Sequence, residues 1–229
     1  MLFLEDPYLK EFDSNIISTN LNQIILKQTI FYAKSGGQPG DTGTLNIKGN
    51  MVNIINTIKD TENNIIHISE NNVDYLNNEK VTGNINWNKR YKHMRMHTAL
   101  HILCAVIPYG VTGGQIGFDK SRLDFDLKDN TIDKTEIQNK LNKLISEDHK
   151  IEYQWITNED LDKNPDLVRT MSVKPPRINE KIRLVKIGNI DLQPCGGTHV
   201  KSTKEVGKIE IQKIENKGKK NRRISIILD

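Results

Sequence analysis

The sequence contains few cysteines, and this scarcity limits the ways in which its fold can be stabilised. Only 2 of its 229 residues are cysteine. Small secreted domains that depend on disulfides carry many more, so we expect no disulfide framework here. So few cysteines are typical of proteins from a reducing compartment, and we therefore predict a cytoplasmic location.

The sequence also lacks a long apolar run. A helix that crosses a bilayer needs about 20 mainly apolar residues, so we predict no membrane span and no membrane partner. The opening residues, MLFLEDPYLKEF, include acidic residues and no basic segment before an apolar one. We therefore expect no signal peptide. Hydrophobic residues make up 36% of the chain and charged residues 27%, which is typical of a globular protein with a modest core.

An excess of one charge is likewise absent. Lysine and arginine number 33 against 29 acidic residues, for a net charge of +4, which alone is too small to indicate a nucleic-acid partner. The basic residues are nevertheless clustered, and such clusters either neutralise phosphates or form ordinary solvated surface. One cluster precedes a histidine-rich segment and the other lies near the C-terminus: Lys89, Arg90, Lys92 and Arg95, then Lys217, Lys219, Lys220, Arg222 and Arg223.

Residues 1–87 have the pattern of an all-β domain. Short runs rich in Ile, Val and Thr are separated by Asn, Gly and Asp, which is typical of strands joined by turns. These runs occupy residues 15–18, 23–26, 44–47, 51–55, 64–68 and 81–87. Their number and spacing predict a small β-barrel, which we assign as the first domain.

Residues 88–229 predict a second domain with both helices and strands. Helical spacing of apolar residues occurs over 88–107 and again over 137–149, with a shorter helical segment over 159–171. We predict strands over 111–118, 122–127, 151–156 and 182–187, a loop over 174–177, and a hairpin formed by 206–214 and 222–228. The chain is therefore predicted to be α+β, with an N-terminal small β-barrel followed by an antiparallel sheet with two packed helices.

The most informative segment is YKHMRMHTALHILCAVI, residues 91–107. His97 and His101 are four apart, so a helix places them on one face, where two imidazoles can bind one metal ion. Far downstream, Cys195 and His199 occur in QPCGGTH. Three imidazoles and one thiolate are a ligand set typical of zinc, so we predict one Zn²⁺ per chain.

Two other side chains are alternative ligands. His93 precedes His97 by one helical turn, but His93 and His101 lie about 12 Å apart along a helix and cannot both join His97 on one ion. Only the His97–His101 pair lies within the apolar helical register. Cys104 is either a substitute ligand or a small buried hydrophobe.

Several motifs carry a family resemblance. HTALHIL, GGQIGFDKSRLDFD and DLQPCGGTHV occur in this order and resemble the editing domain of alanyl-tRNA synthetase. They equally resemble its freestanding relatives, the AlaX proteins. SGGQPGDTG, residues 35–43, is similar to the glycine-rich segment that precedes this domain in both. The resemblance extends from about residue 30 to the end of the sequence.

The resemblance implies a hydrolase that acts in trans and deacylates mischarged tRNA(Ala). Its target would be chiefly Ser-tRNA(Ala), with Gly-tRNA(Ala) as a second substrate, and zinc would assist the ester hydrolysis. The implied partner is the acceptor end of tRNA(Ala) carrying a non-cognate amino acid. The ATP-site motifs of a synthetase are absent, so we expect no ATP and no charging of tRNA.

The resemblance also indicates site residues by motif position. Gln115, Thr98 and Asp191 are the candidate catalytic residues, and Asp191 is a candidate partner for a ligating histidine. The candidate substrate-binding residues combine the glycine-rich segment with a hydroxyl beside the last ligand: Gly36, Gly37, Gln38, Asp41 and Thr198.

Two other functions fit the same residues. The chain could be a tRNA-binding module with a structural zinc, because four protein ligands are typical of closed structural sites. It could also be a metallohydrolase for another aminoacyl or peptidyl ester. Within the editing class, threonyl-tRNA is an alternative target. The sequence does not predict an oligomeric state.

Overall fold

The computed structural model describes residues 1–127, 132–168, 181–218 and 220–229. The chain divides into two compact units, Met1–Lys92 and His93–Asp229, with the division inside helix α1 (Trp87–Val106). We describe each unit by itself. The predicted loop over residues 174–177, the end of the helical segment over 159–171, and Lys219 lie outside the described residues.

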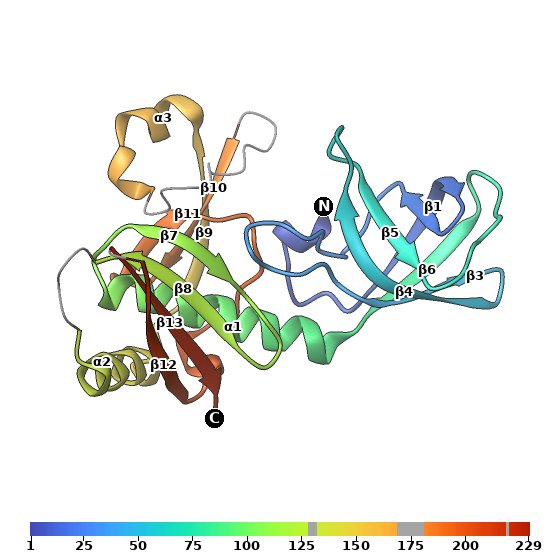
Figure 1. Ribbon diagram of the computed structural model, residues 1–229. Coiled ribbons are helices and arrows are strands. Elements are labelled where there is room, and N and C mark those ends of the chain that lie inside the picture. Colours follow the sequence, from blue (N-terminus) through green and yellow to red (C-terminus); the bar gives the residue numbers. More distant parts are fainter. Residues whose placement is uncertain (128–131, 169–180, 219) are drawn as a thin grey trace. The chain divides into compact units, whose positions relative to one another are not determined.

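The first unit contains a closed barrel of antiparallel strands, which confirms the predicted β-barrel (Figure 1). The order around the barrel is β1-β2-β5-β4-β3-β6, and β6 closes it by pairing with both β1 and β3. The strands are β1 (Glu11–Asn20), β2 (Gln23–Leu26), β3 (Gly43–Ile47), β4 (Asn50–Lys59), β5 (Ile65–Ser69) and β6 (Lys80–Ile85). A short 3₁₀ turn, η1 (Leu2–Leu4), precedes them.

Alternation along the strands builds the barrel core. Phe12 and Ile16 of β1 point inward, as do Leu45 and Ile47 of β3, while Asp13 and Asn46 face outward. Gly83 of β6 is the cross-strand partner of Phe12, and a Cβ atom at Gly83 would be 2.3 Å from the Phe12 ring. The tight packing therefore requires glycine at this position.

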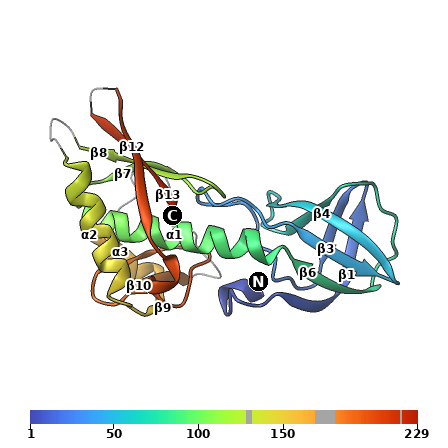
Figure 2. The ribbon, with the colours of Figure 1, turned by 90° about the horizontal axis from the view of Figure 1, so that it is seen from below.

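The second unit contains two antiparallel sheets (Figures 1 and 2). The three-stranded sheet has the order β11-β10-β9, with β9 (Ile151–Thr157), β10 (Lys181–Ile187) and β11 (Asp191–Pro194). The four-stranded sheet has the order β12-β13-β8-β7, with β7 (Val111–Gln115), β8 (Ser121–Asp126), β12 (Ile209–Lys217) and β13 (Asn221–Leu228). The α+β class is thus confirmed, but the strands form two sheets where we predicted one.

The helices of this unit begin at polar caps. Asp133 accepts a hydrogen bond from the amide of Glu136 at the start of α2 (Lys134–Ser146). Thr157 and Asp160 form a capping box at the start of α3 (Asn158–Lys163), which is followed by η2 (Pro165–Leu167), and a further 3₁₀ turn is η3 (Thr203–Val206). Among the described residues, no helix combines the length and apolarity that a membrane span requires.

Register and burial distinguish the two faces of the three-stranded sheet. Ile182 and Leu184 of β10 pack against Leu161 of α3 on one face. Val185 directly follows Leu184, so its side chain points to the other face together with its cross-strand partner Gln193. This second face carries the partners of the histidine ligands described below.

Candidate metal centre

Four predicted ligands come together in the second unit. His97 and His101 lie on α1, Cys195 directly follows β11, and His199 comes one short bend later. Their ligand atoms all lie within 4.8 Å of one another. The three histidines are buried and Cys195 is half-buried. Among the described residues, the cluster contains the His97–His101 pair, whereas His93 and Cys104 lie outside it.

The spacing of the ligand atoms fits a tetrahedral ion. The Cys195 Sγ lies 3.5 Å from His97 Nε2 and 3.4 Å from His199 Nε2. In a tetrahedral zinc site, bond lengths of about 2.3 Å to sulfur and about 2.0–2.1 Å to nitrogen give a sulfur–nitrogen separation of about 3.5 Å. The donor set and its spacing are therefore those of a site that could hold a zinc-like metal ion.

Thr98 lies behind one of the ligands. Its Oγ1 is 3.1 Å from His199 Nδ1 and accepts a hydrogen bond from the amide of Val200 at 3.4 Å. The side chain is fully buried. Because Nδ1 contacts Thr98, the other ring nitrogen of His199 faces the sulfur of Cys195. Thr98 thus orients a ligand ring, in the way that outer partners orient metal-binding histidines.

Asp191 and Gln193 orient a second ligand. His101 Nδ1 lies 3.1 Å from Asp191 Oδ2, and Gln193 Nε2 donates to the same oxygen at 2.8 Å. Burial alone would lower the pKa of His101, but the hydrogen bond to Asp191 and the neighbouring Cys195 outweigh burial and raise the pKa to about 9. Sequence reasoning missed Gln193, because its role depends on the pairing of β11 with β10.

The backbone around Cys195 is held by a buried arginine. Arg183 Nε donates to the Cys195 carbonyl at 3.1 Å, and its Nη2 donates to the Gly197 carbonyl. The guanidinium also stacks on the Tyr153 ring, 4.4 Å from its centroid. Sequence reasoning missed Arg183 as well, although a charged residue within the apolar run of 182–187 was a usable signal.

The sulfur of Cys195 lies in an environment that favours the thiolate. Burial raises the pKa of this thiol, but the charges of His97 and His199 outweigh burial and hold the pKa well below its ordinary value. The amide of Gly197 donates to Sγ at 3.3 Å. A deprotonated cysteine is the form that binds a metal ion.

Two candidates of this unit remain, Gln115 and Thr198. Gln115 is exposed at the end of β7, and its Oε1 accepts a hydrogen bond from Arg122 Nε at 3.3 Å. Thr198 is fully buried beside His199.

In the first unit, the glycine-rich segment forms a tight turn. Gly36 and Gly37 have φ values of +54° and +83°. Ser35 and Gln38 exchange two backbone hydrogen bonds, of 3.1 and 2.8 Å. Consecutive positive φ values between such a pair are typical of a type I′ turn, which glycine adopts most easily. The turn exposes its glycine backbone, whereas Gln38 is buried.

Asp41, at the end of this segment, forms a buried ion pair with Arg90. Arg90 Nε lies 3.1 and 3.0 Å from the two carboxylate oxygens, and the amide of Tyr32 donates to Oδ2 at 2.6 Å. Arg90 also donates to the carbonyls of Pro7 and Ile30, at 2.9 and 2.6 Å. Asp41 therefore connects the glycine-rich segment to the beginning of α1.

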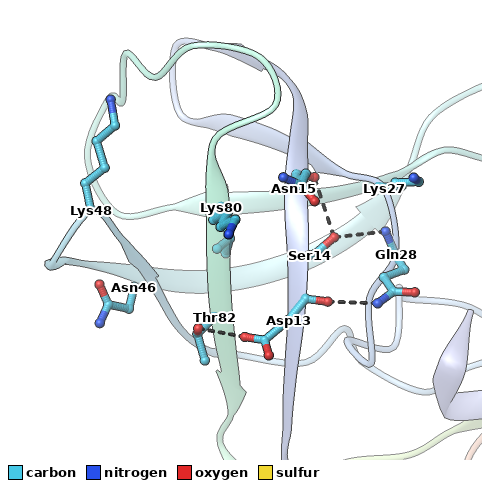
Figure 3. A pocket seen from close by; sticks show the side chains of 10 residues that line it. Asp13, Ser14, Asn15, Lys27, Gln28, Asn46, Lys48, Lys80 and Thr82 are labelled. Atoms are coloured by element: carbon cyan, nitrogen blue, oxygen red, sulfur yellow. Dashed lines mark hydrogen bonds between the residues drawn. The ribbon is translucent and has the colours of Figure 1, made fainter.

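A polar groove with a volume of about 620 Å³ lies on the outer face of the barrel (Figure 3). Lys27, Lys48 and Lys80 contribute positive charge to it, and Lys48 Nζ lies 2.5 Å from Glu79. The remaining lining is mostly neutral and polar, apart from Asp13, whose carboxylate accepts a hydrogen bond from Thr82 at 2.8 Å. We call this surface the lysine groove.

Comparisons with known proteins relate the chain to aminoacyl-tRNA synthetases and their relatives. Residues 182–225 match the family described as threonyl and alanyl tRNA synthetase second additional domain, and residues 4–89 match class II (A) tRNA synthetases. These matches relate the two parts of the chain to domains of class II tRNA synthetases.

The chain belongs to the family of alanyl-tRNA editing proteins of the AlaX type. It is 37% identical to alanyl-tRNA editing protein AlaX-M of Saccharolobus solfataricus, over 97% of this chain and 96% of that protein. It is 35% identical to the AlaX-M protein of Methanosarcina acetivorans, over 100% and 98%. Alanine–tRNA ligase of Pyrococcus abyssi is 34% identical, over 93% of this chain but only 24% of the ligase.

Proposed function

We propose that the protein hydrolyses the ester bond of tRNA(Ala) charged with the wrong amino acid, chiefly serine and secondarily glycine, with the help of one zinc ion. Membership of the alanyl-tRNA editing family supports an aminoacyl-tRNA deacylase. The observation that carries the zinc part of the proposal is the buried cluster of three histidines and Cys195, with sulfur–nitrogen spacings of 3.4 and 3.5 Å.

His97, His101, Cys195 and His199 would hold the zinc ion. A bound zinc ion supplies Lewis acidity, or a fixed point to which the amino or hydroxyl group of the substrate is held. Thr98 and Asp191 are positioning residues in this proposal, because each contacts the outer nitrogen of a ligand ring.

An aminoacyl ester is already activated, so the site needs mainly to position a water molecule and to stabilise the developing oxyanion. The exposed amide of Gln115 is the proposed donor to the ester carbonyl or to that water molecule. The hydroxyl of Thr198 is the proposed contact to the amino acid.

Recognition of the tRNA requires surfaces beyond the cluster. We assign the exposed backbone of Gly36 and Gly37 to the acceptor end, because amides without side chains allow close approach. The buried Gln38 and Asp41 support this turn. Phosphates of the tRNA would bind the lysine groove and the basic residues near the C-terminus, among them Lys217 and Arg222.

The proposal is tested with purified protein, Ser-tRNA(Ala) and correctly charged Ala-tRNA(Ala), by following the loss of ester with time. Cys195→Ala removes a ligand, and its zinc content is measured beside its activity. Cys104→Ala is the matched control, because Cys104 is the other cysteine, is buried, and lies outside the cluster. We expect rapid loss of serine, retention of alanine, and an inactive Cys195→Ala that has lost its zinc.

Other outcomes distinguish the alternatives. Serine release by a zinc-free Cys195→Ala would retain editing but make the metal structural. Salt-dependent tRNA binding without hydrolysis of any ester would contradict the proposed enzymatic function. It would favour a tRNA-binding module with a structural zinc, because four protein ligands are typical of structural zinc sites. Equal hydrolysis of serine esters without tRNA would favour a general metallohydrolase, and Thr-tRNA serves as the second editing substrate to compare.

A further inference from the structure

An exposed tryptophan lies in register with the cysteine ligand. Trp155 of β9 is 44% exposed, and it pairs directly with Arg183 of β10. The amide of Cys195 donates to the Arg183 carbonyl at 3.0 Å, which extends the same row to the third strand. Neighbouring strands lie about 4.8 Å apart, so the Cα atoms of Trp155 and Cys195 are separated by about 10 Å.

Trp155 also shares a face of the sheet with the partners of the metal ligands. Tyr153 and Val185 are cross-strand partners, as are Val185 and Gln193. Directly opposed residues point to the same face, and so do residues two apart on a strand. Trp155 therefore lies on the face from which Gln193 reaches His101, at its outer edge.

The cross-strand partner of Trp155 is the buried Arg183. The guanidinium of Arg183 is fixed by the carbonyls of Cys195 and Gly197 and by the Tyr153 ring. Within the described part of the chain, β9 pairs with β10 alone, so it is the edge strand of this sheet. An exposed, flat aromatic side chain on an edge strand is suited to stacking with a nucleobase.

We propose that Trp155 stacks with the base of the terminal adenosine of the aminoacyl-tRNA. The inference rests on the proposed deacylase function. The ester to be cleaved is attached to the ribose of that adenosine, so a base on Trp155 directs its own ribose along the row toward Cys195. Trp155 is then a substrate-positioning residue that acts on every aminoacyl-tRNA, whatever the amino acid.

The first test compares Trp155→Ala, Trp155→Phe and the unaltered protein in steady-state deacylation of Ser-tRNA(Ala). We expect Trp155→Ala to lower kcat/KM by about tenfold or more, since tenfold corresponds to ~1.4 kcal/mol and lies at the low end of base–aromatic stacking. Trp155→Phe should restore most of the loss, because its ring can still stack. Tyr109→Ala, which removes another partly exposed ring of the same unit, is the matched control and should retain kcat/KM.

The second test reads the contact without catalysis. The sequence has two tryptophans, so Trp87→Phe leaves Trp155 as the only source of tryptophan fluorescence. Uncharged tRNA(Ala) should quench this fluorescence, and tRNA(Ala) lacking its terminal adenosine should quench it much less. Equal quenching by both tRNAs would overturn the inference. So would a Trp155→Ala variant whose kcat/KM equals that of an active unaltered protein. An unaltered protein that hydrolyses no mischarged tRNA would instead contradict the proposed function, and the quenching comparison would still test Trp155.

Discussion

Replacing Asp41 by asparagine tests whether its carboxylate mainly stabilises the first unit. Asp41 is 3% exposed and Arg90 is completely buried. The variant would leave the Arg90 guanidinium inside the unit with the carbonyls of Pro7 and Ile30 but without a counter-charge. Removing one partner of a buried ion pair typically costs about 3–5 kcal/mol. In a unit of this size, 3 kcal/mol corresponds to a fall in melting temperature of roughly 12–24 °C.

The assay is a double-mutant cycle with Asp41→Asn, Arg90→Met and the double variant, each measured by urea and thermal unfolding. Each single variant leaves one buried group without its partner, whereas the double variant removes both groups. We therefore expect the double variant to lose less stability than the sum of the singles, by about 1–3 kcal/mol. Additive losses would refute the reasoning. So would an Asp41→Asn protein that has normal stability but fails to bind tRNA, because Asp41 would then contact substrate.

Three further predictions concern other buried side chains. Burial lowers the pKa of His67 to about 4, below the value of about 6.5 in an unfolded chain. The contribution of the neutral His67 to the unfolding free energy should therefore be fully present above pH 6.5, and the unfolding free energy should fall by up to ~3 kcal/mol as the pH decreases toward 4. His67→Gln should make the unfolding free energy from urea titrations depend less steeply on pH over this range. Gly83→Ala places a methyl group against the Phe12 ring and should destabilise the barrel by about 1–3 kcal/mol, measured by thermal unfolding; an unchanged melting temperature would contradict the packing described. Thr98→Val keeps the side-chain shape but removes the contact to His199, and it should weaken zinc binding by roughly 10- to 100-fold in competition with a chelator while the circular dichroism spectrum is retained.

The barrel was predictable because its information is local. Alternating apolar residues and Asn- or Gly-rich turns indicated all the barrel strands, and β2 has the predicted bounds, residues 23–26. The cluster of four candidate ligands was predictable for a similar reason, since HxxxH and CxxxH each place two such side chains one turn or one bend apart. The structure adds only that the two pairs meet.

The parts that sequence reasoning missed depend on long-range pairing. Nothing within residues 181–194 indicates that Gln193 reaches His101, because this contact requires β11 beside β10 and both beside α1. The division into two sheets has the same origin. β10 is buried on both faces, with Leu184 toward α3 and Val185 on the opposite side, and such a strand has no alternation that would assign it to a sheet.

The placement of the ligands has a consequence for the growing polypeptide. His97 and Cys195 are 98 positions apart, so the helix that carries the first two ligands is synthesised long before the others exist. At about 5–20 residues per second, the interval is roughly 5 to 20 s. During that time the early histidines can offer an ion only half of the final site. In the proposed zinc site, stable metal uptake would therefore come late in biogenesis, and an ion retained by the protein would report that the second unit has been assembled.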